Sequence, residues 1–201
     1  EMLGAQLEGE VRARLAADPT ARLRILEIGA GTGGTSAGLF RRLAPYAAQL
    51  REYAYTDLSR AFLLHAKERY APQAPYLVTH LFDVERDPSA QGLNIGAYDI
   101  VVAANVLHAT RCMRPTMRHA KALLKRNGVL LLNEITRSTL FAHLTFGLLD
   151  GWWLHEDAAL RVPGSPLLSA DSWRALLEDE GFVDLAFPVP LSVDLGSQVI
   201  V

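Results

Sequence analysis

Apolar runs and helical periodicity alternate along most of the chain. The pattern predicts strands at 22–29, 52–57, 75–82, 97–104, 128–135, 183–189 and 197–201, and helices at 3–17, 33–44, 59–70, 112–125, 138–150 and 170–180. The first, fourth and fifth strands are continuously apolar, which is typical of strands buried on both faces of a parallel sheet. Strand–helix alternation then predicts a doubly wound, mostly parallel α/β fold.

The two ends of this pattern differ from its middle. Residues 1–21 contain only the first predicted helix. No helix-length segment separates the last two predicted strands, which favours an antiparallel hairpin at the edge of the sheet. Pro188 and Pro190 fit such an edge, where a missing N–H is tolerated. Ser169 is expected to cap the helix at 170–180.

Composition narrows the class of protein. The 201 residues carry a net charge of −2 and are 50% hydrophobic, which suits one domain over 1–201 with a full core. This balance gives no electrostatic reason to expect nucleic acid or an anionic membrane as partner. The single Cys112 excludes an internal disulfide and favours a reducing, cytoplasmic location. The chain begins at Glu1 and stops within a strand-like run, so we expect a piece of a larger multidomain polypeptide.

The stretch "LEIGAGTGGTS" (26–36) joins the first strand to a helix. Its glycines, among them Gly29, Gly31 and Gly33, allow a sharp turn and close approach of a ligand. The same spacing, with Gly34, also satisfies the G-x-G-x-x-G of dinucleotide binders, so the motif alone is weak. Glu27 shifts the balance, because a carboxylate there disfavours a pyrophosphate and suits a ligand with an ammonium group.

Two further acids end the next two strands. Asp57 is placed to accept both hydroxyls of a ribose, which indicates a nucleoside-type cofactor. Asp83 is placed either to hold an adenine amino group or to cap a turn. Three acids ending three consecutive strands favour a cofactor site over three unrelated caps.

The motifs together resemble the class I S-adenosylmethionine-dependent methyltransferases, and more specifically the methyltransferase domains embedded in modular, trans-acyltransferase polyketide synthases. The resemblance covers about residues 20–201 and is carried by "ILEIGAGTGGTS", "YTDLS", "FDVERDP", "YDIVVAANVLHAT", "LLLNEIT", "LTFGLLDGWWL" and "PLLSADSW". It implies an S-adenosylmethionine site that includes Ala30, Leu58, Val84 and Asn105 besides the glycines and acids above. For Asn105 a turn amide is the equal alternative. It also implies methylation of the α-carbon of a β-ketoacyl chain on an acyl carrier protein.

His108 and Glu134 follow the fourth and fifth strands, which are expected to be neighbours. Ligands of open α/β sheets bind at the carboxyl ends of the strands, so both residues are predicted at the same rim, with His108 exposed. We expect His108 to act as a general base on the acidic α-carbon and Glu134 to accept its other ring hydrogen. The alternatives are a histidine that closes a turn and a glutamate that caps a helix. The remaining histidines show no metal-ligand spacing, so a zinc site is not predicted.

Two features bear on substrate and partner. Trp152 and Trp153 either line an acyl pocket or belong to the core. A row of basic residues at helical spacing is a candidate docking face for an acidic carrier protein, although an ordinary solvated face is favoured: Arg111, Arg114, Arg118, Lys121 and Lys125.

Three alternatives stay open. Close relatives methylate a β-hydroxyl oxygen, and many carbon-methylating relatives carry a large N-terminal lid, where this sequence has only residues 1–21 before the first strand. A non-catalytic structural or cofactor-binding module is a further alternative. A nicotinamide reductase of the same architecture is disfavoured by Glu27 and by the expected hairpin.

Overall fold

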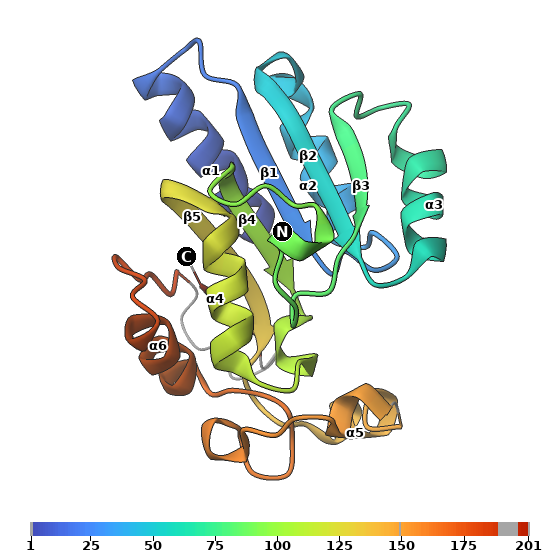
Figure 1. The fold of residues 1–201 in the computed structure, drawn as a ribbon, viewed down its shortest axis with the longest axis vertical. Coiled ribbons are helices and arrows are strands. Elements are labelled where there is room, and N and C mark those ends of the chain that lie inside the picture. The colour runs from blue at the N-terminus through green and yellow to red at the C-terminus, as the bar shows by residue number, and fades with distance from the viewer. Residues whose placement is uncertain (1, 149, 189–196, 201) are drawn as a thin grey trace.

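The protein is described by a computed structural model that covers residues 2–148, 150–188 and 197–200. One six-stranded sheet forms its centre (Figure 1), made of β1 (Leu23–Ile28), β2 (Leu50–Asp57), β3 (Leu77–Leu81), β4 (Tyr98–Ala104), β5 (Leu124–Ile135) and β6 (Ser197–Ile200). The strand order is β3-β2-β1-β4-β5-β6, and only β6 runs antiparallel to its neighbour. The predicted doubly wound α/β fold is therefore confirmed.

This order places the first strand, β1, in the middle of the sheet. The chain runs outward from β1 to β3, crosses back to β4 beside β1, and continues outward to β5. The strand order reverses between β1 and β4, which is the place where open α/β sheets form their ligand crevice. The glycine turn after β1 and the segment that carries His108 after β4 both lie at this point.

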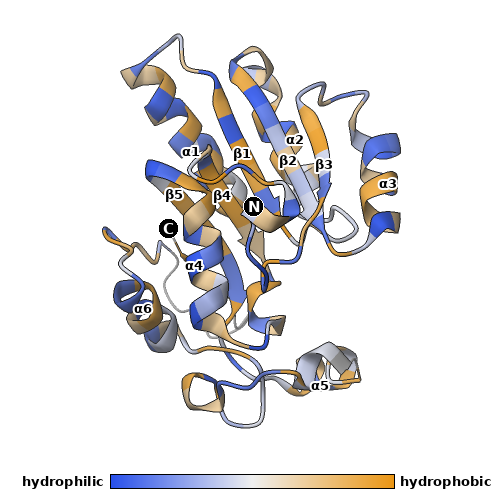
Figure 2. Ribbon diagram, viewed as in Figure 1, coloured by the Kyte–Doolittle hydropathy of each residue, from blue (hydrophilic) through white to orange (hydrophobic). Residues whose placement is uncertain are grey.

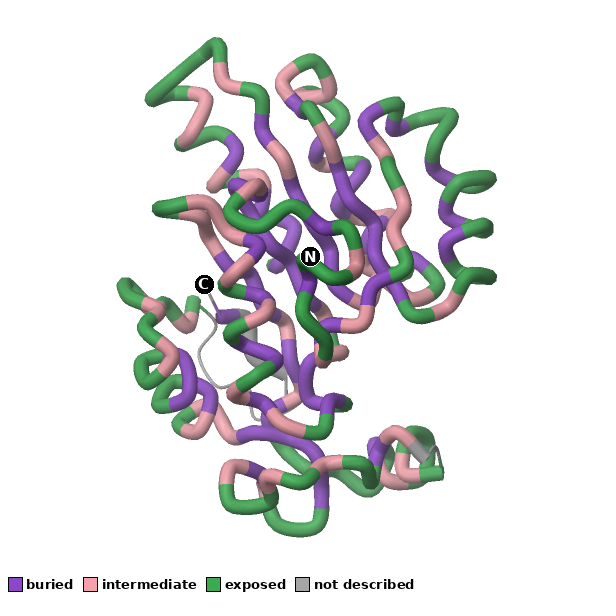
Figure 3. Tube along the Cα trace, viewed as in Figure 1, coloured by how far each residue is buried: buried purple, intermediate pink, exposed green. Residues whose placement is uncertain are grey.

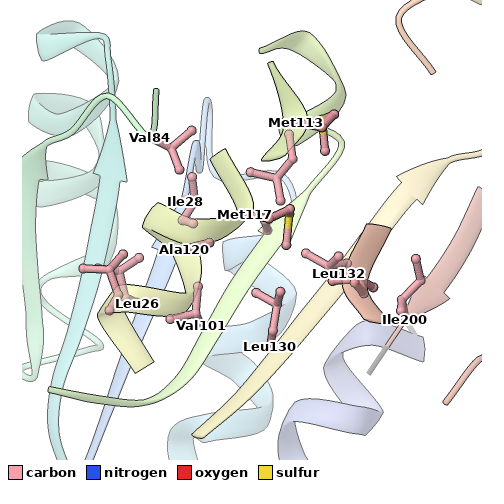
Figure 4. Close-up of a cluster of buried hydrophobic side chains, with 14 of the residues drawn as sticks. Leu26, Ile28, Val84, Val101, Met113, Met117, Ala120, Leu130, Leu132 and Ile200 are labelled. Carbon is pink, nitrogen blue, oxygen red and sulfur yellow. The ribbon is translucent and has the colours of Figure 1, made fainter. Parts of the chain in front are cut away.

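Helices cover both faces of the sheet. One face packs against α1 (Met2–Ala17), α2 (Ser36–Leu43) and α3 (Arg60–Tyr70), and the other against α4 (Met113–Leu123) and α6 (Ala170–Asp179). Side chains of successive strand residues point to opposite faces, so Ile25 joins the first core and Leu26 the second. Figure 4 shows Leu26 and Val101 opposite Met117 and Ala120 of α4. Figure 2 shows hydrophilic and hydrophobic residues side by side on α4 and α6, as expected for helices with one face on the core.

Two predicted elements are wrong. The predicted helix at 138–150 is reduced to α5 (Leu140–Thr145), with a 3-10 turn at Asp150–Trp153, because it contains Gly147, which favours a helix poorly. The predicted strand at 183–189 is absent from 183–188, where Asp184 adopts a left-handed φ of 57°. Within residues 2–148, 150–188 and 197–200, this edge of the sheet is consequently formed by β6 alone, without the predicted hairpin partner at 183–188. Pro188 lies outside any strand, and Pro190 falls outside the described residues.

Other boundaries moved by a few residues, most of all in β5. This strand begins at Leu124, directly after α4, and not at the predicted residue 128. Its pairing with β4 shifts between Tyr98 and Ile100, and Asn127 has a left-handed φ of 61° within the irregular stretch. The predicted cap of α6 is confirmed, since the Ser169 hydroxyl accepts the N–H of Ser172 at 3.0 Å.

The segment that carries α5 lies beyond the carboxyl ends of β4 and β5 (Figure 1), and Figure 3 shows that much of it is exposed. Several of its large apolar side chains are exposed: Leu140, Phe141, Leu144, Phe146, Leu148, Trp153 and Leu154. Among the described residues, no helix is both long and apolar enough to span a membrane.

Candidate active site

The glycine turn after β1 is held in a conformation that depends on three of its glycines. Gly29, Gly31 and Gly33 have φ values of 60°, 60° and 81°, a region that L-residues rarely adopt. A Cβ on Gly29 would lie 2.2 Å from Val106, and one on Gly33 would lie 2.5 Å from the hydroxyl of Tyr70. These two glycines are therefore also required for packing.

Gly31 differs from its neighbours because open space lies where its Cβ would point, with no atom within 4 Å. Its backbone is thus the part of the turn that a ligand can approach most closely. Gly34 has an ordinary φ and the same open surroundings, so nothing in the structure requires a glycine there.

Glu27 lies beneath the turn and is 1% exposed. Its Oε2 accepts hydrogen bonds from the hydroxyls of Ser36 and Tyr53, both at 2.7 Å. Burial raises the pKa of the Glu27 carboxyl to about 7, although the two hydrogen bonds oppose the shift. The same burial raises the pKa of the Tyr53 phenol. Glu27 therefore supports the turn from below, and its contact with a ligand ammonium group stays a prediction.

Asp57 joins the glycine turn to the end of β2. Its Oδ2 accepts the N–H of Gly31 at 2.9 Å, and its Oδ1 accepts the N–H of Ser59 at 2.7 Å. Each carboxylate oxygen can accept two hydrogen bonds, so both keep a free acceptor site for a ligand hydroxyl. Leu58 follows directly and is 68% exposed, which leaves an apolar side chain beside this carboxylate.

Asp83 follows β3 and takes part in a turn. Its Oδ1 accepts the N–H of Glu85 at 2.9 Å, and Gln91 bridges its backbone N–H and carbonyl. The turn-capping alternative is therefore present in the structure, while the contact with an adenine amino group stays a prediction. Val84 is buried in the core that packs on α4. Asn105 ends β4 with a left-handed φ of 52° and is exposed.

His108 and Glu134 form a close pair between β4 and β5. Nδ1 of His108 lies 2.5 Å from Oε2 of Glu134, and the other carboxylate oxygen accepts the N–H groups of Val106 and Leu107 at 3.1 and 2.9 Å. Glu134 is fully buried and His108 is 6% exposed. The expectation that His108 is an exposed rim residue is therefore wrong, because Glu134 draws the imidazole inward.

The pairing fixes the proton on the imidazole. An ionised carboxylate can only accept a hydrogen bond, so Nδ1 carries the hydrogen and Nε2 of the neutral ring keeps its lone pair. Nε2 makes no hydrogen bond to any described residue. Four described side chains have a polar atom that is closed to solvent and has no hydrogen-bond partner: Tyr76, Trp152, His155 and Trp173. Nε2 of His108 is not one of these atoms. Access of a substrate proton to the lone pair of Nε2 is therefore a prediction of this geometry.

Trp152 and Trp153 take different positions. Trp152 is 4% exposed, and its ring meets the His108 ring edge-on, with the centroids 6.0 Å apart. It also packs against His143 and Phe146. Trp153 is exposed and donates its Nε1–H to the carbonyl of Gly147 at 2.9 Å. Only Trp152 therefore contacts His108, and the predicted role of both residues in an acyl pocket stays a prediction.

The basic row on α4 is not a free positive surface. Arg114 and Arg118 form ion pairs with Asp179 and Glu180 at the end of α6. Lys121 donates to the carbonyls of Glu180 and Gly181 at 2.7 and 2.8 Å.

The two ends of the row are also engaged within the chain. Lys125 bonds both oxygens of Asp99 at 2.8 Å, and the Arg111 guanidinium lies 3.4 Å from Glu156. All five cations therefore have partners within the chain, and their role as a docking face stays a prediction.

Ser36 and Tyr53 were missed by the sequence reasoning. Ser36 and Tyr53 follow Glu27 by 9 and 26 positions in the sequence and donate hydrogen bonds to its carboxylate. No local sequence pattern indicates such contacts. Among the described residues, no group of three or more His, Cys, Asp or Glu side chains is placed to share a metal ion.

Comparison with known proteins agrees with this geometry. Residues 26–130, more than half of the chain, match the family described as "Methyltransferase domain". Polyketide synthase PksM of Bacillus subtilis (strain 168) is 57% identical over 187 residues, which are 93% of this chain and 4% of that protein.

Two solved structures are also similar. The crystal structure of DszA carbon methyltransferase has a TM-score of 0.88 at 42% identity, covering 98% of this chain and 52% of that chain. The trans-methyltransferase CalH in complex with SAH has a TM-score of 0.76 at 35% identity, over 90% and 50% of the two chains. The chain thus spans a small part of PksM and about half of each solved chain. It belongs to the methyltransferase-domain family, and its sequence is similar to a segment of polyketide synthases.

Proposed function

We propose that this chain binds S-adenosylmethionine and methylates the α-carbon of a β-ketoacyl chain held as a thioester on an acyl carrier protein during polyketide synthesis. The observation that carries the proposal is the His108–Glu134 pair at the switch point of the sheet, whose Nδ1–Oε2 contact leaves Nε2 without a partner among the described residues. The likeness to DszA carbon methyltransferase and to PksM supports the choice of carbon and of polyketide synthesis.

The glycine turn and the strand ends suit the cofactor. Gly31 leaves open space against its backbone, where a side chain would block a ligand. The spare acceptor sites of Asp57 suit the two ribose hydroxyls, and the exposed Leu58 offers an apolar surface to the adenine. Asp83 and Asn105 follow β3 and β4, whose carboxyl ends lie at the same rim of the sheet. When bound, S-adenosylmethionine supplies an electrophilic methyl group whose sulfur leaves as a neutral thioether.

His108 generates the nucleophile. The α-hydrogen between a ketone and a thioester is acidic enough for a neutral imidazole to remove it. Nε2 takes this proton, and the electron pair of the C–H bond passes into the enolate, whose carbon forms the new bond to the methyl group. The imidazolium later releases the proton to solvent, which returns the base to its starting state.

Glu134 prepares His108 for this step. Its Oε2 accepts the Nδ1–H, so the ring cannot present a protonated Nε2 while neutral. The carboxylate also stabilises the imidazolium that forms, as in the orienting acid of a hydrolytic triad. Its second oxygen fixes the backbone at Val106 and Leu107, so the ring and its chain segment are held by one group.

Oxygen methylation of a β-hydroxyacyl chain is the second candidate, because the same base could act on a hydroxyl. Carbon is favoured because a hydroxyl is much less acidic than the α-hydrogen of a β-ketoacyl thioester, which makes a neutral imidazole a weaker match for it.

The test is mass spectrometry of carrier-bound β-keto and β-hydroxy substrates after incubation with methyl-labelled S-adenosylmethionine. We expect the label on the α-carbon of the β-keto substrate. Label found only on the hydroxy substrate would show that the chain methylates oxygen and not carbon. No label on either substrate would favour a non-catalytic module. His65→Asn, on the exposed face of α3, is the matched control for His108→Asn. Calorimetry with S-adenosylmethionine and NADPH tests the cofactor separately.

A further inference from the structure

The segment that follows α5 carries a buried ion pair that the mechanism above does not use. Nε of Arg161 lies 2.6 Å from Oδ1 of Asp157, and only 1% of the arginine side chain is exposed. A buried guanidinium is costly unless it is paired and hydrogen-bonded, so its partners indicate what it holds in place.

Those partners are mainly carbonyl groups of the segment that carries His108. Nη1 of Arg161 donates to the carbonyl of His108 at 2.8 Å, and Nη2 donates to that of Thr110 at 2.9 Å. Nη1 also bonds the carbonyl of Pro166 at 2.6 Å. The Asp157 carboxylate extends the same contact, because its Oδ2 accepts the N–H of Met113 at the start of α4.

The backbone around His108 is therefore held by two opposite charges. Glu134 of β5 takes the N–H groups of Val106 and Leu107, and Arg161 takes the carbonyls of His108 and Thr110. The acid binds the donors of this short segment and the cation binds its acceptors. Glu134 also bonds the His108 ring, so any displacement of the backbone changes the Nδ1–Oε2 contact.

We propose that Arg161 is a positioning residue for the general base: it fixes the backbone of His108 so that Nδ1 meets Glu134 and Nε2 faces the substrate. This inference rests on the proposed function of His108. The planar guanidinium suits the task, because its N–H groups point to one carboxylate and three carbonyls at once. A lysine can supply the positive charge and some of the hydrogen-bond donors, but its N–H groups do not have the fixed planar arrangement of a guanidinium.

Arg161→Met and Arg161→Lys test the role, with Arg24→Met as the matched control. Arg24 forms a part-buried ion pair with Glu52 at the amino-terminal end of β1, opposite the site. Displacing a reacting group by about 1 Å can cost on the order of 10²-fold in rate. For Arg161→Met we expect a loss in kcat of that order per folded molecule, with little change in KM. Arg161→Lys should recover part of the loss, and Arg24→Met should keep kcat.

Two further readouts separate positioning from a general loss of stability. The pH profile of kcat should change its acid limb in Arg161→Met, because a displaced His108 loses its contact with Glu134. Nitrogen NMR of labelled histidine, assigned with His108→Asn, should show loss of the Nδ1–H tautomer in Arg161→Met and its retention in Arg24→Met. Thermal unfolding gives the folded fraction of each variant.

Wild-type kcat, acid limb and tautomer in folded Arg161→Met would overturn the inference. If that variant does not fold, the same three properties unchanged in Arg161→Lys overturn it instead. The NMR readout needs no substrate, so it distinguishes the two proposals. A wild-type protein that holds the tautomer but does not methylate refutes the proposed function, whereas an unchanged tautomer in the Arg161 variants refutes only the positioning role.

Discussion

Glu134 holds His108 by its ring and by its backbone at once, with Nδ1 at 2.5 Å from one carboxylate oxygen and the preceding N–H groups on the other. The imidazole therefore has its tautomer and its place set by a single buried side chain. Removing either partner is expected to act mainly on the rate of reaction.

Replacing His108 by asparagine removes the base and leaves the glycine turn intact. Loss of a general base costs roughly 10²–10⁴-fold in rate, so we expect kcat to fall by that factor. The affinity for S-adenosylmethionine, measured by calorimetry, should stay near wild type, as should kcat of the control His65→Asn. An unchanged kcat in His108→Asn would show that another group removes the proton.

Glu134→Gln keeps the shape of the acid and removes its charge. If the amide oxygen keeps the backbone N–H groups, the NH2 group faces Nδ1 and forces the ring proton onto Nε2, where it blocks the base. We expect kcat to fall on the order of 10²–10⁴-fold, because a histidine in the wrong tautomer cannot accept the substrate proton. Steady-state kinetics with carrier-bound substrate measures this effect, and activity within a few-fold of wild type would contradict it.

The buried Glu27 makes stability depend on pH. Its pKa is raised to about 7, above the ordinary value of 4.5, so the folded state binds a proton more tightly than the unfolded state. The corresponding stability is fully present below pH 4.5 and is lost as the pH rises through about 7. Over this window the loss is on the order of 3 kcal/mol.

Denaturant unfolding of Glu27→Gln tests this dependence. The variant should gain stability relative to wild type as the pH rises from 4.5 to about 7, because glutamine does not titrate. Glu68→Gln, on the exposed face of α3, is the matched control for removal of a carboxyl group that is not buried. A difference for Glu27→Gln that does not change with pH would refute the raised pKa.

Alanine substitutions separate the glycines of the turn. Gly33→Ala should destabilise on the order of 2–3 kcal/mol, because it combines a left-handed φ with a clash against the buried Tyr70. Gly31→Ala carries only the left-handed strain, roughly 1–2 kcal/mol, and should also weaken S-adenosylmethionine binding by filling the open space.

Gly34→Ala is the matched control in the same turn. Its φ is ordinary and its surroundings are open, so its stability should stay within about 0.5 kcal/mol of wild type. Cofactor affinity that falls equally in Gly31→Ala and Gly34→Ala would show that Gly31 is not the closest point of approach.

Reversing a charge on α4 should weaken the contact with α6. In Arg118→Glu the new carboxylate faces Glu180, whose pKa is lowered mainly by its hydrogen bond to Arg118. We expect a loss of about 1 kcal/mol or less, since this pair is screened by solvent. A lowered acid pKa stabilises above the ordinary value of 4.5, so the difference from wild type should shrink as the pH falls below it. Arg51→Glu, at an exposed position on β2 with no ion pair among the described residues, is the control.

Sequence periodicity located the parallel strands well, because strands buried on both faces have a continuous apolar run, as at 97–104. It also placed His108 and Glu134 at one rim, since neighbouring parallel strands end together. It failed where long-range contacts decide the outcome. The helix at 138–150 looked continuous, and Arg161 lies in a loop without periodicity, so its contact with the His108 carbonyl left no local signal.

Because α4 passes directly into β5, the number of residues between His108 and Glu134 decides whether the two side chains meet. Side chains alternate along a strand, so one residue inserted between Val129 and Asn133 would turn Glu134 to the opposite face of the sheet. The irregular stretch at 125–128, where the pairing with β4 is already interrupted, can absorb an added residue without that shift. Length variation in relatives that keep the pair is therefore expected before Val129 and not after it.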